Sequence, residues 1–227
     1  MSTLQTLDRG LSVLELVSQR PAGVSVAELA AALDVHRAIC YRIVATLEAH
    51  ALVSRAEDGR IRLGAGTAVL AARFEPQLRH TAQPVLHALA RETRATAYVS
   101  VAQGEDCIVV LVAEPESSLI RVGYRVGSRH RLTVGAAGIA ILALRPRRHG
   151  EPDAVEAARR DGYCVTAGQL ERGAVGVASG IEVPSGMGGG TGIEACVGVV
   201  ALDGLDVAAA ATAVVRAARE ISALVSA

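Results

Sequence analysis

The chain has 227 residues, of which 51% are hydrophobic, and its formal net charge is zero. This length allows one large domain or two small ones, and the apolar content is sufficient for a buried core. No apolar run approaches the length of a membrane span, and the N-terminus lacks the pattern of a signal peptide. We therefore expect a cytoplasmic protein without membrane contacts.

The four cysteines are widely spaced, at Cys40, Cys107, Cys164 and Cys196, and none belongs to a CxxC pair. Zinc sites usually combine such pairs with nearby cysteines or histidines, so the spacing argues against a metal centre. We expect buried free thiols in a reducing compartment, and no metal or cofactor.

The first predicted helix covers Thr6–Ser18, because its leucines and Val17 fall on one helical face, and Arg20–Gly23 ends it. A second helix is predicted to begin at Ser25, since Ser25 and Glu28 have the spacing of a capping box. Asp34-Val35 then leaves room only for a tight turn, in which Asp tolerates a left-handed conformation.

The third predicted helix follows at His36–Ala49 and has two different faces. At about 100° per residue, Cys40, Ile43, Val44 and Leu47 lie on one side. The other side carries small residues around a single arginine, Arg42, with Ile39 and Tyr41 flanking it. A helix with such a face can enter a groove deeply, because no bulky charge cluster blocks it.

Two short apolar–polar runs follow, separated by Asp58-Gly59, which predicts a β-hairpin. Helix, tight turn, helix and hairpin together indicate a winged helix-turn-helix, whose second helix enters the DNA major groove. Between residues 36 and 63, five arginines oppose three acidic residues. The candidate DNA-contacting residues are Ser25, His36, Arg37, Ala38, Ile39, Tyr41, Arg42, Arg55, Arg60 and Arg62. The alternative is a helical packing module that does not bind nucleic acid.

After this module the pattern changes to that of an α+β sensor-like domain. Helices are predicted at Thr67–Phe74, Leu78–Thr93, Thr133–Leu144, Asp153–Arg160 and Val207–Leu224. Strands are predicted at Ala97–Ala102, Cys107–Ala113, Leu119–Tyr124, Val175–Val183 and Ile193–Leu202. Among them, Ala97–Ala102 alternates like a half-buried strand, whereas Cys107–Ala113 is a continuous apolar run typical of a fully buried one.

These features together resemble the IclR family of bacterial transcription regulators, over nearly the whole chain. The segment from Leu7-Asp8-Arg9-Gly10-Leu11 to Ile61-Arg62-Leu63-Gly64 carries the N-terminal resemblance, and "DVHRAICYRIVATLEAHALV" within it is close to the family pattern. In the second half, "GSRHRLTVGAAGIAIL" at Gly127–Leu142 is similar to the family's effector-domain loop and helix, and Arg160–Tyr163 and Gly173–Ile181 are similar to its next landmarks.

The resemblance implies a winged helix-turn-helix domain at 1–64, a linker helix at 65–80, and an effector-binding and oligomerisation domain at 81–227, similar to GAF and PAS sensors. It also implies homodimers, often paired into tetramers, on palindromic operators in double-stranded DNA. The chain departs from the family pattern at Asp34, where Gly is usual, and at Ala38 and Ile39, where small polar residues are usual. Between Leu144 and Asp161 it lacks about one helix of family sequence.

By the same resemblance, an effector pocket is expected between the loop before Ala136 and the strands that follow. Its candidate residues are Arg129, Arg131, Cys164, Thr166, Gly176, Gly180, Cys196, Val197 and Val199. Few of these side chains can meet a charged group once it is desolvated, so we predict a largely apolar or aromatic effector with at most one anionic group. The alternative is a collapsed pocket and a regulator without a ligand.

Three other patterns are weaker. Gly186–Gly192 suggests a phosphate-binding loop, but the strand-like sequence after it favours a hairpin link. Cys164 or Cys196 as a nucleophile would need a neighbouring histidine and carboxylate, which the spacing does not supply. The arginines between Arg121 and Arg131 fit a solvated strand-and-loop edge better than a buried anion site.

We therefore predict a DNA-binding transcriptional regulator controlled by a small molecule and acting as a homo-oligomer. The alternatives are a regulator that keeps the fold without binding DNA, and an enzyme that uses the C-terminal domain. The sequence shows neither an acid–base pair nor a metal cluster, which argues against the enzyme.

Overall fold

The computed structural model describes residues 4–115, 124–182, 193–202 and 204–226. Its contacts divide the chain into two compact units, Met1–Pro76 and Gln77–Ala227. Each unit has its own hydrophobic core. The predicted strand at Leu119–Tyr124, apart from Tyr124, and the glycine-rich segment Gly186–Gly192 lie outside the described residues.

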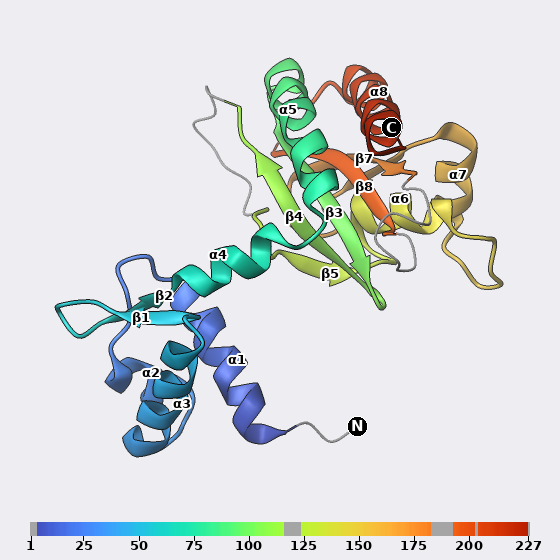
Figure 1. Cartoon of the computed structure of the whole chain (residues 1–227). Coiled ribbons are helices and arrows are strands. Elements are labelled where there is room, and N and C mark those ends of the chain that lie inside the picture. Colours follow the sequence, from blue (N-terminus) through green and yellow to red (C-terminus); the bar gives the residue numbers. More distant parts are fainter. Residues whose placement is uncertain (1–3, 116–123, 183–192, 203, 227) are drawn as a thin grey trace. The chain divides into compact units, whose positions relative to one another are not determined.

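The N-terminal unit has four helices and a two-stranded antiparallel hairpin among its described residues (Figure 1). They are α1 (Gln5–Ser18), α2 (Val26–Ala32), α3 (Arg37–Ala49), β1 (Val53–Arg55), β2 (Ile61–Leu63) and α4 (Ala65–Ala72). This order is the winged helix-turn-helix that the sequence predicts. Its core joins the buried faces of α1, α2 and α3 to one residue of each hairpin strand, Val53 and Ile61.

The start of α2 confirms the predicted capping box. The Ser25 hydroxyl accepts a hydrogen bond from the backbone N–H of Glu28 at 3.2 Å, and the Ser25 N–H donates to the Glu28 carboxylate at 2.8 Å. Two backbone amides at the helix start thus have partners. The turn after α2 is tight, and Asp34 adopts φ 50°, the left-handed conformation expected there.

The helix after the hairpin begins earlier than the sequence predicts. We expected Gly64-Ala65-Gly66 to delay it until Thr67, but α4 begins at Ala65 with Gly64 as its N-cap. A Cβ at Gly64 would lie 2.2 Å from the carbonyl oxygen of Ala51, and one at Gly66 2.8 Å from the same atom. Both glycines therefore let the start of α4 pack closely against the backbone at Ala51, just before the hairpin. Reading them only as helix breakers does not reveal this contact.

The C-terminal unit is built on a six-stranded antiparallel sheet with the strand order β5-β4-β3-β8-β7-β6. Helices α5 and α8 cover one face, and α6 and α7 cover the other (Figure 1). The strands are β3 (Thr96–Gln103), β4 (Asp106–Ala113), β5 (Arg129–Arg131), β6 (Cys164–Ala167), β7 (Ala174–Ile181) and β8 (Ala195–Leu202). The helices are α5 (Pro76–Thr93), α6 (Gly135–Leu144), α7 (Asp153–Asp161) and α8 (Val207–Ser226).

The burial of the first two strands of this sheet is the reverse of the prediction. Six consecutive residues of β3, from Thr96 to Val101, are buried, whereas along β4 buried and half-buried residues alternate. Strand β3 lies in the middle of the sheet, between β4 and β8, and a β-bulge falls between Val99 and Ser100. The place of each strand in the sheet decides how far it is buried, and the amino-acid composition of one strand does not predict that place.

Candidate nucleic-acid interface and ligand region

The two faces of α3 are those expected from its period. Cys40, Ile43, Val44 and Leu47 are buried against the other helices. The outer face is open to solvent, and two large side chains remain exposed on it, Ile39 by 41% and Tyr41 by 53%. Alanines fill much of the remaining surface of this face, so it carries few bulky groups that would hinder its entry into a groove.

The five arginines proposed to contact DNA fall into two groups, with and without an internal partner. Arg37 and Arg42 on α3 are exposed and make no side-chain hydrogen bond or ion pair within the described part of the chain. On the hairpin, by contrast, each arginine has an internal partner. The closest polar contacts are Arg55 to the Gly59 carbonyl at 3.4 Å, Arg60 to the Gly23 carbonyl at 3.0 Å, and Arg62 to Asp58 at 3.8 Å. Arg37 and Arg42 on α3 can therefore meet a phosphate without first breaking an internal contact.

The ends of the two helices are capped in different ways. Ser25 and Glu28 close the start of α2, and Glu28 also lies 3.6 Å from Arg60. At the start of α3, Nδ1 of His36 accepts a hydrogen bond from the backbone N–H of Ala38 at 3.3 Å. His36 thus acts as an N-cap, a role that the sequence argument did not assign to it.

Part of the expected effector region lies on the sheet face beneath α6, where side chains come close to two glycines of the sheet. A Cβ at Gly176 would lie 3.6 Å from both the Ala136 methyl and the Thr166 hydroxyl. At Gly198 the phenol of Tyr98 occupies the equivalent space, 2.5 Å from where a Cβ would lie. Tyr98 is only 2% exposed and packs edge-on against Tyr124, with ring centroids 4.6 Å apart.

The residues proposed for this pocket do not share one surface. Cys196 packs on the α6–α7 side of the sheet, while Val197 and Val199 belong to the core on the α5–α8 side. The expectation that all three line one pocket is wrong, because successive side chains of a strand point to opposite faces.

Arg129 and Arg131 also differ from the expectation of cations facing a ligand. They lie exposed on β5, where Arg129 pairs with Asp106 and Arg131 pairs with both Glu105 and Asp106. This agrees with the prediction of a solvated strand edge. Strand β5 itself was not predicted, since three residues carry too little periodicity.

The four cysteines are buried and free. Burial raises the pKa of Cys164 to about 11, and it raises the pKa of Cys196 as well, so both remain protonated thiols at neutral pH. Cys107 lies opposite His130 across β4 and β5, and the neighbouring Cys196 and His130 lower its pKa. Because the Cys107 side chain is fully buried, this thiol has no surface at which a substrate could reach it.

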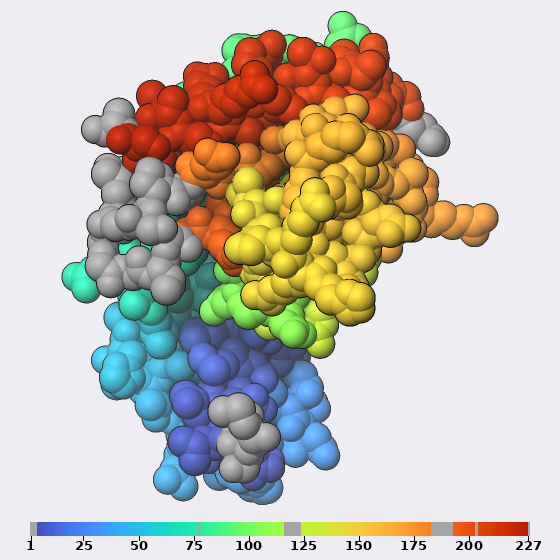
Figure 2. All heavy atoms as spheres, turned by 90° about the vertical axis from the view of Figure 1, so that its right-hand side faces the viewer, coloured from blue at the N-terminus to red at the C-terminus, as the bar shows by residue number. Residues whose placement is uncertain are grey.

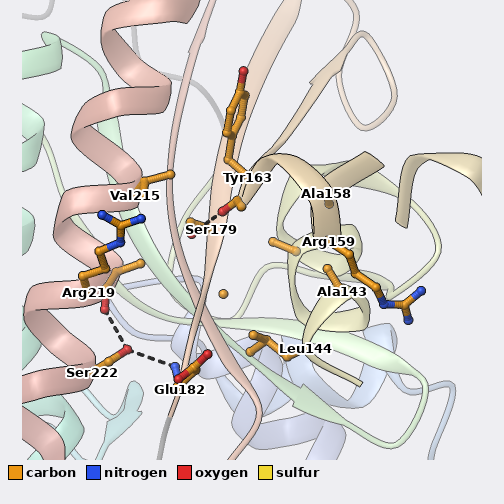
Figure 3. Close-up of a pocket in the computed structure, with 14 residues that line it drawn as sticks. Ala143, Leu144, Ala158, Arg159, Tyr163, Ser179, Glu182, Val215, Arg219 and Ser222 are labelled. Carbon is orange, nitrogen blue, oxygen red and sulfur yellow. Dashed lines mark hydrogen bonds between the residues drawn. The ribbon is translucent and has the colours of Figure 1, made fainter. Parts of the chain in front are cut away.

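A hollow does exist elsewhere in the C-terminal unit. A groove of about 590 Å³ lies between α8 on one side and α6 and α7 on the other, with β7 as its floor (Figure 3). In the space-filling view, α8 (red) runs along the surface beside the yellow atoms of α6 and α7 (Figure 2). Gly180 was predicted as a site residue, but the groove itself was not. Its lining comes from elements that are far apart in the chain.

Two family models match the chain. The one described as the IclR helix-turn-helix domain matches residues 6–57, and the one described as the bacterial transcriptional regulator IclR C-terminal matches residues 73–152. The chain belongs to the IclR family. The match of the second IclR model ends before α7, so much of the groove is built from residues beyond it.

Curated IclR-family relatives are distant in sequence. The chain is 31% identical over 144 residues to the HTH-type transcriptional regulator Rv1719 of Mycobacterium tuberculosis, and 27% identical over 146 residues to the HTH-type transcriptional regulator TtgV of Pseudomonas putida. Each alignment covers 63% of this chain and 55% of the relative. The chain thus spans about half the length of the curated relatives it matches.

Solved IclR structures match the fold over almost the whole chain. An IclR regulator from Alicyclobacillus acidocaldarius has a TM-score of 0.75 at 22% identity, covering 99% of this chain and 100% of the other. An IclR homologue from Microbacterium hydrocarbonoxydans, crystallised with 4-hydroxybenzoate, has a TM-score of 0.78 at 20% identity, covering 97% and 99%. At these identities the likeness shows the fold.

Proposed function

We propose that the protein is a DNA-binding transcriptional regulator that reads its operator with α3. The observation that carries this is the outer face of α3, where Arg37 and Arg42 have no partner within the described chain and small or apolar residues lie between them. Major-groove recognition needs a helix that can approach base edges while cations meet the phosphates. Membership of a family of transcriptional regulators supports the same role.

In this proposal the remaining candidate residues position the helix. At the start of α2 the capping box occupies the Ser25 and Glu28 amides, which leaves those of Val26 and Ala27 for a phosphate, and Tyr41 offers a hydroxyl. The hairpin arginines Arg55, Arg60 and Arg62 would contact the backbone beside the groove. Ala38 and Ile39 would pack on thymine methyl groups, because neither can hydrogen-bond a base.

Self-association follows from how little DNA one such helix reads. A single recognition helix contacts only a few base pairs, so two copies on an inverted repeat are needed for useful specificity. The N-terminal unit exposes apolar side chains that suit a dimer contact. On α1 these are Leu7 and Leu11, and on or just after α4 they are Val69, Leu70 and Phe74, each between 41% and 62% exposed. We propose a dimer, or a tetramer of two dimers.

We also propose control by a small, largely apolar or aromatic effector with at most one anionic group. The homologue crystallised with 4-hydroxybenzoate, an aromatic monoacid, supports this class. An effector changes operator affinity only if it binds the DNA-competent and DNA-incompetent states with different affinity. No catalytic step is part of this proposal, and binding to the chromosome implies a cytoplasmic location.

One observation favours a second candidate, a regulator without a ligand. The sheet face beneath α6 carries the buried Tyr98 phenol over Gly198, and Ala136 and Thr166 lie in contact range of Gly176, so side chains occupy part of the region where the resemblance puts the effector. The two candidates differ in one measurable property, which is whether any small molecule changes operator affinity.

The deciding experiment is selection of bound genomic DNA fragments by the purified protein, followed by sequencing and footprinting. We expect enrichment of an inverted repeat protected over two half-sites. The matched control is Arg42→Ala, which should lose the enrichment while keeping the wild-type circular dichroism spectrum. Equal enrichment by wild type and Arg42→Ala would contradict the assignment of α3, and a single protected half-site would contradict the dimer.

A further inference from the structure

The groove between α8 and the α6–α7 pair has a largely polar accessible lining, with a few apolar side chains on its walls. Its lining residues are Ala140, Ala143, Leu144, Ala158, Arg159, Gly162, Tyr163, Ser179, Gly180, Glu182, Val215, Ala218, Arg219 and Ser222. Ala143 and Leu144 of α6 form one wall, and Val215 of α8 faces them across the groove (Figure 3). Leu144 also reaches the floor, because Gly180 has no side chain to keep it away from β7. Leu144 and Val215 on opposite walls thus leave a place for a planar ring, and the polar lining around them can meet its substituents.

Both serine hydroxyls in the groove are already used as donors. Ser179 donates to the Gly162 carbonyl at 2.7 Å, and Ser222 donates to the Ala218 carbonyl at 2.8 Å. Ser222 also accepts a hydrogen bond from the backbone N–H of Glu182 at 3.0 Å, which ties the end of β7 to α8. These bonds fix the shape of the groove, and they leave ligand recognition to other groups.

Two charged groups remain available. Within the described part of the chain, Arg219 makes no ion pair or side-chain hydrogen bond, and the same is true of the Glu182 carboxylate. In Figure 3, Glu182 lies at one end of the groove and Tyr163 at the other, with Arg219 on α8 between them. By contrast, Arg159 points away from the groove and is held by Glu151 at 2.8 Å.

From this arrangement we propose that the groove binds an aromatic monocarboxylate that also carries a hydrogen-bond donor on its ring. The carboxylate pairs with Arg219, the ring lies between Leu144 and Val215, and the donor meets Glu182. A second carboxylate is rejected, because it would lie against the Glu182 carboxylate. The volume of about 590 Å³ falls in the usual range for small-molecule sites and holds one or two rings.

Calling this ligand an effector rests on the proposed regulator function, whereas its binding to the groove does not. The groove would give the effector a site apart from the sheet face beneath α6. Contacts with separate elements explain how such a ligand could act. It would touch Leu144 of α6, Val215 and Arg219 of α8, and Glu182 just after β7, so its binding free energy depends on their mutual placement.

The test is calorimetric titration of the full-length protein, without DNA, with four matched probes. We expect 4-hydroxyphenylacetate to bind. Phenylacetate lacks the donor and should bind several-fold more weakly. Tyramine replaces the carboxylate by an ammonium group and should not bind, and 1,4-phenylenediacetate, which has a second carboxylate, should not bind either.

Variants then locate the site. Arg219→Gln should weaken binding of 4-hydroxyphenylacetate by about ten-fold or more, as expected for loss of a charge-assisted hydrogen bond. Ala143→Phe should abolish it by filling the groove. The matched control is Arg91→Gln, an exposed arginine in the last turn of α5 that does not line the groove, and Arg129→Gln on β5 is a second control. Neither control should change the affinity, and all four variants should keep the wild-type melting temperature to within a few degrees.

Several outcomes would overturn the proposal. Binding of 1,4-phenylenediacetate as tight as that of 4-hydroxyphenylacetate would remove the role of Glu182. Unchanged affinity in both Arg219→Gln and Ala143→Phe would place the ligand elsewhere, even if operator binding stands. Absence of binding by all four probes would also refute it. Conversely, a failure to enrich DNA would reject the regulator while leaving these titrations interpretable.

Discussion

The two units of this protein differ in where their arginines find acidic partners. Among the described residues of the C-terminal unit, seven arginines form ion pairs with acidic neighbours: Arg129, Arg131, Arg145, Arg147, Arg159, Arg160 and Arg216. On α3 of the N-terminal unit, Arg37 and Arg42 have no partner within the described chain. The face of α3 that is proposed to meet DNA thus keeps both of its cations free. In the C-terminal unit, Arg219 combines the lack of an ion pair among the described residues with a place in the lining of the groove.

Glycines permit close approaches in both units. In the N-terminal unit, Gly64 and Gly66 allow α4 to approach the Ala51 carbonyl, and in the C-terminal unit Gly138 allows a similar approach to the Leu132 carbonyl. Gly198 and Gly180 in the C-terminal sheet also make room for large side chains, the phenol of Tyr98 and Leu144. Backbone packing therefore uses glycine in both units, and the sheet uses it in addition to admit side chains.

The strongest consequence of this contrast concerns Arg42. Arg42→Ala removes one charge-assisted contact, so operator affinity should fall at least ten-fold, about 1.5–3 kcal/mol. The slope of log affinity against log salt concentration should decrease by about one. Fluorescence anisotropy on a selected operator measures both. Arg60→Ala provides the contrast, since Arg60 contacts Gly23 and Glu28, and its loss should lower thermal stability as well as affinity. Identical titrations of wild type and Arg42→Ala would refute the role of α3.

The next consequence concerns packing in the C-terminal unit. Gly198→Ala would force a methyl group against the Tyr98 phenol and the Val177 carbonyl, which would lie 2.5 Å and 2.6 Å away. Overpacking of this kind should destabilise the unit by about 1–3 kcal/mol. Urea unfolding followed by tyrosine fluorescence measures the loss. The control Gly104→Ala changes a glycine that has no neighbour within 4 Å, although its positive φ adds a backbone cost. Equal stability of Gly198→Ala and wild type would mean that Tyr98 does not fill this face.

A more modest change is expected at the start of α2. Ser25→Ala should destabilise the N-terminal unit by about 1 kcal/mol, because an N-cap hydrogen bond is lost. Hydrogen exchange of the α2 amides measures this change locally, and Ser12→Ala on α1 serves as a control at a half-buried serine inside a helix. Unchanged exchange at α2 would show that the capping box does not hold the helix.

The same capping box gives a pH dependence. Hydrogen bonds from the Ser25 backbone and hydroxyl lower the pKa of Glu28 below its usual value. A carboxylate with a lowered folded-state pKa stabilises the fold above its unfolded pKa, and this contribution is lost as the pH falls through the folded pKa. The α2 amides of wild type should therefore lose protection in acid, and Glu28→Gln should flatten that part of the profile.

The weakest of these effects tests how bases are read. If Ala38 and Ile39 pack on thymine methyl groups, replacing thymine by uracil at one operator position should cost about 0.8 kcal/mol, roughly four-fold in affinity. Competition titrations with singly substituted operators measure it. Absence of an effect at every position would leave base recognition to Arg42 and Tyr41.

The agreement between sequence and structure differs between the units for a physical reason. In α3 the 3.6-residue period alone separates the buried Cys40, Ile43 and Val44 from the exposed Ile39 and Tyr41. In the sheet, the burial predicted for Cys107–Ala113 and for Ala97–Ala102 is wrong in degree for both strands. A helix carries its own inside and outside in its sequence, whereas a strand's burial depends on neighbours that are remote in the chain.

Local spacing in the chain is sufficient for the winged helix-turn-helix, its capping box, the two faces of α3 and the resemblance to the IclR family. Each of these depends on residues that are close together in the sequence. The central position of β3 and the packing of Tyr98 beneath α6 emerge only in the folded unit. Folding also brings Tyr163, Glu182 and Arg219 together around one groove. Those outcomes depend on strand order and on which side chains meet across the sheet, and neither follows from the local order of residues.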